Sequence, residues 1–297
     1  MVLGVAVASG DPVGDPEQWG AVIDCFVSAA RSRRHRVAVL GAGERARELW
    51  SRHQLSAVAF GRDVVLHRDR FVLTGRENRN LRQAIQRTRN SGVTVEFHRE
   101  GELPPAVRTE LTSVMRSAHR LNERGFSMLL GNLFSGREPD AVLAVARDDT
   151  GRIVAAHRYL WAGKQDLSLD VPVRTARPPN GVDERLVAET VEWGREHGVE
   201  RISLALAPFP DLYAERASHG PLGRTLLVLT HLLDPLIKVE RLYRYLRKFH
   251  AFDQQRYVML RWRQAVVVVP ALLLLEFGHD RAQQHRPWHA RLRRRSA

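Results

Sequence analysis

"AVLAVARDDTGRIVAAHRYLW", residues 141–161, contains two apolar runs on either side of a short polar segment. The alternating runs predict two strands, and Asp148-Asp149-Thr150-Gly151 between them has the composition of a tight turn. An aspartate pair before glycine also occurs in calcium loops, but the remaining ligand positions of such a loop are missing. We therefore predict an antiparallel hairpin at this point of the chain.

The segments that follow the hairpin determine the fold class. A third strand is predicted over 167–174, followed by the loop "ARPPNG", a helix over 182–197 and a strand over 201–206. This order differs from the βαβαβ repeats of a doubly wound sheet. It favours an α+β fold of the N-acyltransferase type, in which the acyl donor lies where two neighbouring parallel strands splay. Pro172 fits a bulged strand there.

The N-terminal half contains one motif with another interpretation. A strand over 36–40 leads into Gly41-Ala42-Gly43 and a helix over 44–53, and Asp63 follows. This pattern is that of a dinucleotide-binding turn, but on its own it is weak. The alternative is a sharp turn in which glycine lets the helix leave the strand. We favour the turn and expect no nicotinamide cofactor.

The charge of the chain points to a polyanionic partner. The formal net charge is +13, and 14 basic residues against 4 acidic ones lie between Lys238 and the end. Such a field attracts tRNA, other nucleic acids or anionic lipid headgroups. For the residues after 280, a solvated basic tail is the alternative.

Several classes of protein are disfavoured by what the sequence lacks. The single cysteine, Cys25, excludes an internal disulfide and is typical of a reducing compartment. The sequence has neither the G-x-S-x-G of a serine nucleophile elbow nor the H-E-x-x-H of a zinc protease, and we expect no metal site. The longest apolar run, 265–275, is too short to cross a bilayer. It predicts either a strand with a core helix or a segment at a membrane surface.

Six segments, in this order, resemble a known family. They are "SGDPVGD" (9–15), "NLRQAIQRTRNSGV" (80–93), "ERGFSM" (123–128), "SLDVPVRTARPPNGVDERLVAE" (168–189), "LALAPF" (204–209) and "LYRYLRKFHAFDQQRY" (242–257). Together they resemble the cytosolic domain of the MprF-like phosphatidylglycerol lysyltransferases over residues 3–262. The resemblance implies two tandem GNAT-like lobes. It also implies transfer of lysine or a similar amino acid from aminoacyl-tRNA to the hydroxyl of phosphatidylglycerol.

The resemblance also implies a domain organisation and partners. The first lobe is expected over 1–98, truncated at its start, and the second, with the transfer site, over 105–263. An apolar segment and basic tail follow over 264–297. The implied partners are aminoacyl-tRNA, an anionic phospholipid membrane and a membrane-spanning, flippase-like segment, with the chain in the cytoplasm at the inner face of the cell membrane. The alternatives are an acceptor such as a peptidoglycan precursor, or a non-catalytic basic domain that binds membrane or RNA.

Asp170 and Arg174 are the candidate catalytic residues. Positions i and i+4 of a strand face the same side unless a bulge intervenes. The carboxylate could then orient the donor's amino group or the acceptor hydroxyl, and the arginine could bind a phosphate or the developing oxyanion. The family pattern resembles Asp-Leu-Met-Arg, whereas this chain has Asp-Val-Pro-Val-Arg. A structural ion pair on the sheet is the alternative.

Two further segments supply candidate substrate-binding residues. The helix that begins in "PPNGVDE" could bind a phosphate or carboxylate with its free N–H groups, or Asn180 could simply cap it. The loop before it lacks the glycine pattern of acetyl-coenzyme A enzymes, so no coenzyme A is expected. The basic segment 241–257 could hold the tRNA acceptor stem or a lipid phosphate, or form a solvated helix face. The predicted binding residues are Asn180, Gly181, Glu184, Arg244, Arg247, Lys248 and Arg256.

Overall fold

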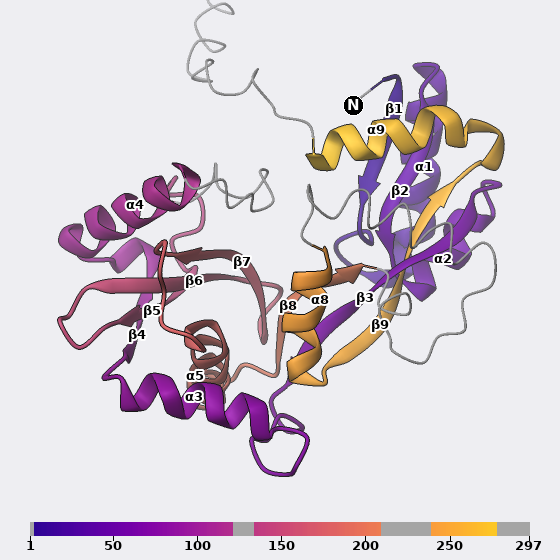
Figure 1. The fold of residues 1–297 in the computed structure, drawn as a ribbon. Helices are drawn as coiled ribbons and strands as arrows, with labels where there is room; N and C mark the ends of the chain where they lie inside the picture. Colours follow the sequence, from indigo (N-terminus) through magenta and orange to yellow (C-terminus); the bar gives the residue numbers. More distant parts are fainter. Residues whose placement is uncertain (1–2, 121–133, 209–238, 278–297) are drawn as a thin grey trace, which may run out of the picture.

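The strands of the described part of the chain form one mixed sheet in the order β1-β2-β9-β3-β8-β7-β6-β5-β4 (Figure 1). A computed structural model of the 297-residue chain describes residues 3–120, 134–208 and 239–277. Within the sheet, β1 pairs with β2 and β7 with β8 in parallel, while the other neighbours are antiparallel. The α+β prediction, a mixed sheet flanked by helices, is therefore confirmed.

The first part of the chain alternates strands and helices, and its residues contribute to four buried clusters. Its elements are β1 (Val5–Ser9), α1 (Trp19–Ser32), β2 (Arg36–Ala42), α2 (Glu44–Ser51), β3 (Ser56–His67), α3 (Arg79–Asn90), β4 (Thr94–Arg99) and α4 (Pro105–Arg120). Apolar residues of α1 and α2, such as Ile23 and Trp50, pack with Met259 of the C-terminal strand. β3 is one long strand, and its pairing with β8 and β9 contains register shifts.

The second part begins with the predicted hairpin. Its elements are β5 (Val142–Arg147), β6 (Ile153–Trp161), β7 (Asp166–Arg174), α5 (Val182–Glu196), β8 (Arg201–Pro208), α8 (Val239–Leu246), the short 3-10 turn η4 (Arg247–Phe249), β9 (Phe252–Leu260) and α9 (Ala265–Phe277). In the hairpin turn, the Asp148 carboxylate accepts hydrogen bonds from the backbone N–H groups of Thr150 (3.0 Å) and Arg152 (2.9 Å). The aspartate therefore stabilises the turn, as the hairpin interpretation expects.

The two predicted lobes share strands. β9, from near the end of the described chain, lies between β2 and β3, and β4 pairs with β5 at the far edge. Each of the predicted ranges 1–98 and 105–263 thus supplies a strand to the other's half of the sheet. The boundaries themselves stay a prediction.

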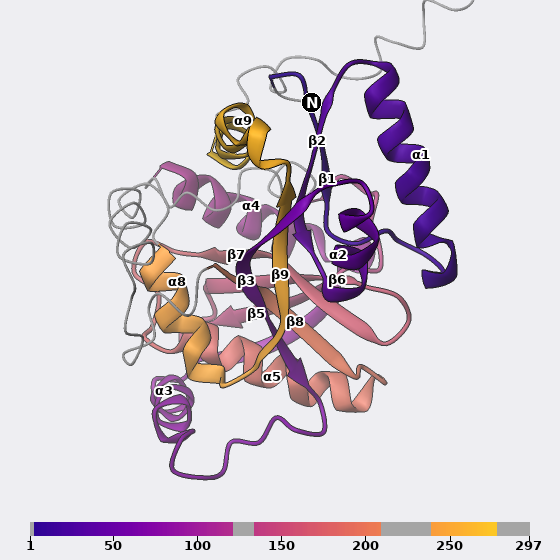
Figure 2. The ribbon, with the colours of Figure 1, turned by 90° about the vertical axis from the view of Figure 1, so that its right-hand side faces the viewer.

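The two faces of the second half carry different helices. α3, α5 and α8 supply residues to the large core on one face, which includes Leu81, Leu186 and Leu246. α4 packs on the opposite face with Leu143 and Val171. Successive residues of a strand point to opposite faces, so neighbouring positions of β6 and β7 serve two different environments. Figure 2 shows α8 and α9 on one side of β9, and α1 on the other.

Gly181 fixes the contact between α3 and α5, and alanine at this position is expected to destabilise the fold. Its φ is +97°, and an added Cβ would lie 2.6 Å from the carbonyl oxygen of Ala84. Because this backbone oxygen cannot move away cheaply, we expect Gly181→Ala to lower the free energy of unfolding by about 3 kcal/mol. Gly198→Ala is the control, since Gly198 has a φ of +74° but nothing within 4 Å of an added Cβ. Urea unfolding should show a loss of only about 1 kcal/mol there. Equal losses would contradict the close contact.

Candidate functional site

The parallel strands β7 and β8 pair only at one end. Their register runs from Asp166↔Arg201 to Ser168↔Ser203 and does not continue. Beyond this point β7 keeps only β6 as a partner, and its own register shifts between Leu169 and Val171. The opening between the two strands is the splay expected of an acyltransferase-like lobe, and it leads to the N-terminal end of α5.

The register shift separates Asp170 from Arg174. Leu169 packs in the core of the α5 face, whereas Val171 and Val173 both pack in the core of the α4 face. The extra residue of the bulge resets the alternation of β7, so that Asp170 points toward α4 and Arg174 toward α5. A bulge thus intervenes between the two residues, so their side chains do not share a side of the strand and they contact different partners.

Asp170 belongs to a buried group of charges on the α4 face. The Arg158 guanidinium binds the Asp170 carboxylate through Nη1 and the Glu100 carboxylate through Nε. The side chains of these three residues are 1–4% exposed. The Phe134 N–H also donates to Glu100 Oε1, at 3.1 Å. Asp170 therefore forms a structural ion pair, as the alternative interpretation proposed, but its partner is Arg158 and not Arg174. Because its side chain is only 4% exposed, the carboxylate is not accessible to a substrate.

Arg174 instead lies at the start of α5 with a second aspartate. Its Nη1 is 2.8 Å from Asp183 Oδ2, and the other oxygen, Oδ1, is 3.1 Å from Nε2 of His157. His157 is buried in β6, and its Nδ1 is 3.1 Å from the hydroxyl of Tyr159. Burial alone would raise the pKa of Asp183, but His157 and Arg174 outweigh it and hold this pKa below its ordinary value. Asp183 is thus an ionised carboxylate that orients an exposed arginine.

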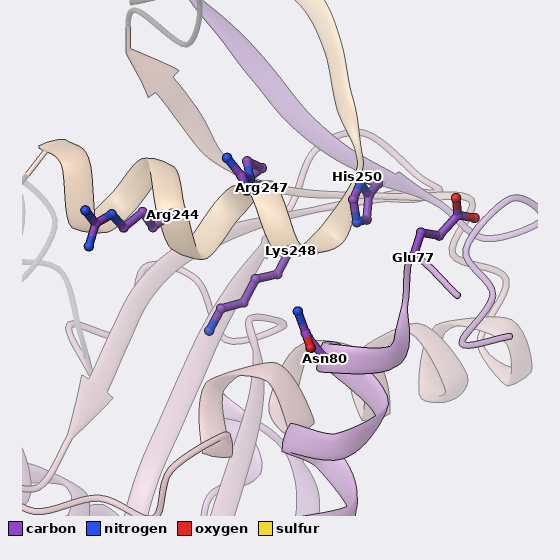
Figure 3. Close-up of a pocket in the computed structure, with 6 residues that line it drawn as sticks. All are labelled: Glu77, Asn80, Arg244, Arg247, Lys248 and His250. Carbon is purple, nitrogen blue, oxygen red and sulfur yellow. The ribbon is translucent and has the colours of Figure 1, made fainter. Parts of the chain in front are cut away.

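A cationic cleft adjoins this cluster. It has a volume of about 480 Å³ and is lined by Glu77, Asn80, Arg244, Arg247, Lys248 and His250. Figure 3 shows Lys248 and His250 on the side of α8 and η4, and Asn80 and Glu77 on the opposite side, at the start of α3. Lys248 Nζ is 2.6 Å from Oε1 of Glu184, whose side chain is only 7% exposed. The structure thus brings together four of the predicted binding residues: Glu184, Arg244, Arg247 and Lys248.

The hydroxyl of Tyr245 is an unsatisfied polar group beside the cluster. It is buried and has no hydrogen-bond partner among the residues that the structure describes. Burial raises the pKa of Tyr245 well above its ordinary value, and the negative charges of Asp183 and Glu184 add to the effect. The hydroxyl therefore stays protonated inside the protein.

The remaining residues of the α5 N-terminus have structural roles. Gly181, not Asn180, is the residue at the N-cap position, and no side chain caps this end. Asn180 is exposed in the loop, so the capping alternative for it does not hold. Asp183 and Glu184 occupy the first helical turn, where they complement the helix dipole. An anionic ligand would approach this end through Arg174 and Lys248 rather than through the bare backbone.

Arg256 lies in a separate cluster around the glycine-rich turn. Its guanidinium binds Asp63 Oδ2 at 2.6 Å and Asp11 Oδ2 at 2.7 Å. The other Asp11 oxygen accepts a hydrogen bond of 2.7 Å from the N–H of Gly43, at the start of α2. The place at which a dinucleotide-binding turn would contact a pyrophosphate is thus occupied by the chain's own carboxylate. This geometry favours the turn interpretation. Among the described residues, Arg256 forms its ion pairs with Asp11 and Asp63, not with the predicted binding residues of α8.

Three residues of the site were not predicted from the sequence: His157, Asp183 and Tyr245. A weak signal existed for two of them. His157 interrupts the apolar run of its strand, and Asp183 lies within the quoted "PPNGVDE". Tyr245 was part of the aromatic pattern in the basic segment, but nothing marked it among the tyrosines there.

Comparison with known proteins agrees with the acyltransferase-like geometry of the site. Residues 2–260 match the family described as "Phosphatidylglycerol lysyltransferase, C-terminal". The chain belongs to this family. The lysyltransferase-family resemblance that the sequence segments carried is therefore confirmed, and the splayed strands and cationic cleft are features of a family member.

Individual relatives of this lysyltransferase-family chain agree. It is 44% identical to the MprF-like domain protein Rv1619 of Mycobacterium tuberculosis, over 93% of this chain and 58% of that protein. It is 32% identical to the lysylphosphatidylglycerol biosynthesis bifunctional protein LysX of Rhodococcus opacus, over 97% of this chain and 27% of that protein. The chain thus spans only part of the length of these relatives.

A solved structure shares the fold. The structure of L-PGS from Bacillus licheniformis superposes with a TM-score of 0.75 at 19% identity, over 93% of this chain and 83% of that one. Among the described residues, no helix is both long and apolar enough to cross a membrane. The same residues contain no group of three or more acidic, histidine or cysteine side chains that could hold a metal ion. The histidines that the sequence places after residue 278 lie outside the described part.

Proposed function

We propose that this chain transfers an aminoacyl group, lysine in the first instance, from aminoacyl-tRNA to a glycerol hydroxyl of phosphatidylglycerol. The observation that carries the proposal is the cationic cleft beside the ionised Arg174–Asp183 pair at the splayed strands. The phosphate of the lipid and the phosphates of tRNA are both anionic, and arginine and lysine side chains of this cleft match them. The names of the relatives, which refer to lysylphosphatidylglycerol synthesis, support the choice of lipid and amino acid.

The reaction needs no covalent intermediate on the chain. The acceptor hydroxyl oxygen attacks the ester carbonyl of the donor, a new carbon–oxygen bond forms, and the bond to the tRNA ribose breaks. The proton of the acceptor hydroxyl ends on the ribose oxygen, so atoms and charge balance. What the chain must supply is positioning of the two substrates and stabilisation of the oxyanion.

Residues of the site fit these two tasks. Arg174 is 41% exposed and held by Asp183, so its guanidinium can meet a phosphate or the developing oxyanion. His157 is too deeply buried to touch a substrate, and its role is to position Asp183. We assign the catalytic role predicted for Asp170 to the Arg174–Asp183 pair instead.

The setting in the cell is part of the same proposal. An acceptor with two acyl chains requires the chain to work at a membrane, and a tRNA donor requires the cytoplasmic side. We therefore propose a peripheral position at the inner face of the cell membrane, with a membrane-spanning, flippase-like segment as a partner. No coenzyme A, nicotinamide or metal is assigned to the reaction.

The test is direct transfer of label into lipid. Purified chain is incubated with phosphatidylglycerol vesicles and total tRNA charged with labelled amino acids, and the lipid is extracted. We expect label in the lipid that RNase pretreatment abolishes, with lysine released on hydrolysis. If label appeared only in a peptidoglycan precursor, the acceptor would be that precursor and not phosphatidylglycerol. Binding of tRNA or vesicles without any transfer would favour a non-catalytic domain and overturn the proposal.

Loss of Lys248 is expected to weaken substrate binding. Lys248→Ala removes a cation from the cleft and leaves the buried Glu184 carboxylate unpaired. We expect KM for the substrate that carries the bound phosphate to rise about 10-fold, a usual effect for one charged hydrogen bond. Lys164→Ala, which removes an exposed lysine elsewhere, is the matched control and should leave KM unchanged. An unchanged KM in Lys248→Ala would remove Lys248 from the site.

A further inference from the structure

The helix α9 packs against the sheet by only one of its faces. Val268, Ala271 and Leu272 are buried against Val5 of β1 and Leu260 of β9. Although helices on a protein surface normally carry polar residues on the outer face, every residue from Ala265 to Leu275 is apolar. The outer face of the helix is therefore made of apolar side chains over residues 265–275.

The outer face is exposed over more than two turns. Val266 is 86% exposed, Val269 43% and Leu274 51%. Trp262, which lies just before the helix, is 64% exposed. These positions recur at the spacing of one helix side, so they form a continuous apolar strip rather than scattered residues. We call Trp262, Val266, Val269 and Leu274 the α9 strip.

Arginines precede and follow this strip in the sequence. Arg263 is exposed just before α9, and Arg261 precedes Trp262. After the helix, residues 278–297 contain six arginines and a single acidic residue, Asp280. An apolar strip that is flanked by arginines and an interfacial tryptophan is complementary to an anionic lipid surface, because apolar groups enter the acyl boundary while the guanidinium groups stay at the headgroups.

We propose that α9 lies in the plane of an anionic bilayer surface and docks the chain there through the α9 strip. A span is excluded by length, because 13 residues of helix are about 20 Å long and a hydrocarbon core is about 30 Å thick. A second copy of the chain is the less suitable occupant, since its own strip would bring the same arginines against each other. This inference deepens the proposed function, because it names the surface that meets the lipid.

The strip lies on the same side of the C-terminal strand as the helix of the cleft. Figure 2 places α9 and α8 on one side of β9, and α1 on the other. A bilayer that contacts α9 would thus lie on the same side of β9 as α8. The lipid acceptor would reach the cleft without leaving the surface.

Vesicle binding of the full chain without tRNA tests the docking. Val266→Asp with Val269→Asp is compared with Val13→Asp with Val72→Asp, which makes the same charge change at two exposed valines outside α9. On vesicles of phosphatidylcholine and phosphatidylglycerol, we expect the α9 pair to lower the partition coefficient about 30-fold or more, and the control pair by less than about 3-fold. Vesicles of pure phosphatidylcholine should bind the wild type weakly. Val266→Ser with Val269→Ser repeats the test without added charge.

Other outcomes would overturn the docking. One is equal vesicle binding by the α9 pair and the control pair. Another is a wild-type dimer in sedimentation that the α9 pair dissociates while vesicle binding persists, since this result would assign the strip to a second copy. Transfer assays keep this inference separate from the proposed function. If docking and function are both right, the α9 pair loses transfer on vesicles but keeps it with phosphatidylglycerol in detergent micelles. Transfer that is absent for the wild type in both would overturn the function and leave the vesicle result to decide the docking.

Discussion

Substituting Arg158→Met is expected to destabilise the protein by about 3–5 kcal/mol, the usual cost of removing one partner from a buried ion group. The change leaves the Asp170 carboxylate and one oxygen of Glu100 without their shared cation, in a position where the side chains are almost inaccessible to water. Two carboxylates that had shared one guanidinium are then left close together and without that cation on the α4 face of the sheet. We expect urea unfolding to show the loss as a lower midpoint with an unchanged slope.

A combined variant separates the charge from the packing. Glu100→Gln, Arg158→Leu and Asp170→Leu together remove all three charges, and glutamine keeps an acceptor for the N–H of Phe134. Most of the lost stability should return, because a buried ion group can be replaced by apolar residues at little net cost. The single variant Asp170→Asn provides the contradicting outcome. If it were fully stable but inactive, Asp170 would return to the catalytic role that the sequence predicted.

Substituting Arg174→Ala is expected to reduce the rate of aminoacyl transfer about 100-fold while leaving the fold intact. The Arg174 side chain is 41% exposed, and His157 still contacts the Asp183 carboxylate after the change, so the free energy of unfolding should fall by only about 1–2 kcal/mol. We expect the rate to fall because the change removes the guanidinium that we propose to stabilise the oxyanion. Arg177→Ala, at an exposed arginine of the loop that follows β7, is the control. A rate within a few-fold of the wild type would exclude Arg174 from the reaction.

The Arg174–Asp183 pair makes the stability of the fold depend on pH. The pKa of Asp183 is lower in the folded chain than in the unfolded one, so the pairing with His157 and Arg174 stabilises the fold at every pH above the unfolded value. This contribution is lost as the pH falls through the folded pKa. Asp183→Asn should therefore flatten the acid limb of the stability curve, as well as slow transfer by releasing Arg174.

Sequence reasoning predicted the hairpin, the order of elements after it and the basic segment of α8. These features depend on local patterns: alternation within β5 and β6, turn chemistry at Asp148, and helical spacing of basic and aromatic residues. The sheet order was not accessible in the same way. Nothing local in residues 252–260 shows that they insert between β2 and β3, because pairing between distant strands depends on the whole chain.

The candidate site shows the same division. Arg244, Arg247, Lys248 and Glu184 were predicted from charge and position, and the structure brings them together. The pairing of Asp170 with Arg174 failed because a single extra residue at the bulge of β7 reverses the side to which each later residue points. The contact between His157 and Asp183 could not be predicted, because it depends on β6 lying next to the start of α5.

Hydrogen exchange in the presence of a short-chain phosphatidylglycerol tests most directly where the site lies. We expect slower exchange at residues 182–185, at the start of α5, and at 242–250, in α8, η4 and the residue after it, with residues 105–117 of α4 unchanged. Slower exchange confined to α4 and the strand around Asp170 would place the lipid on the opposite face of the sheet and contradict the site described above.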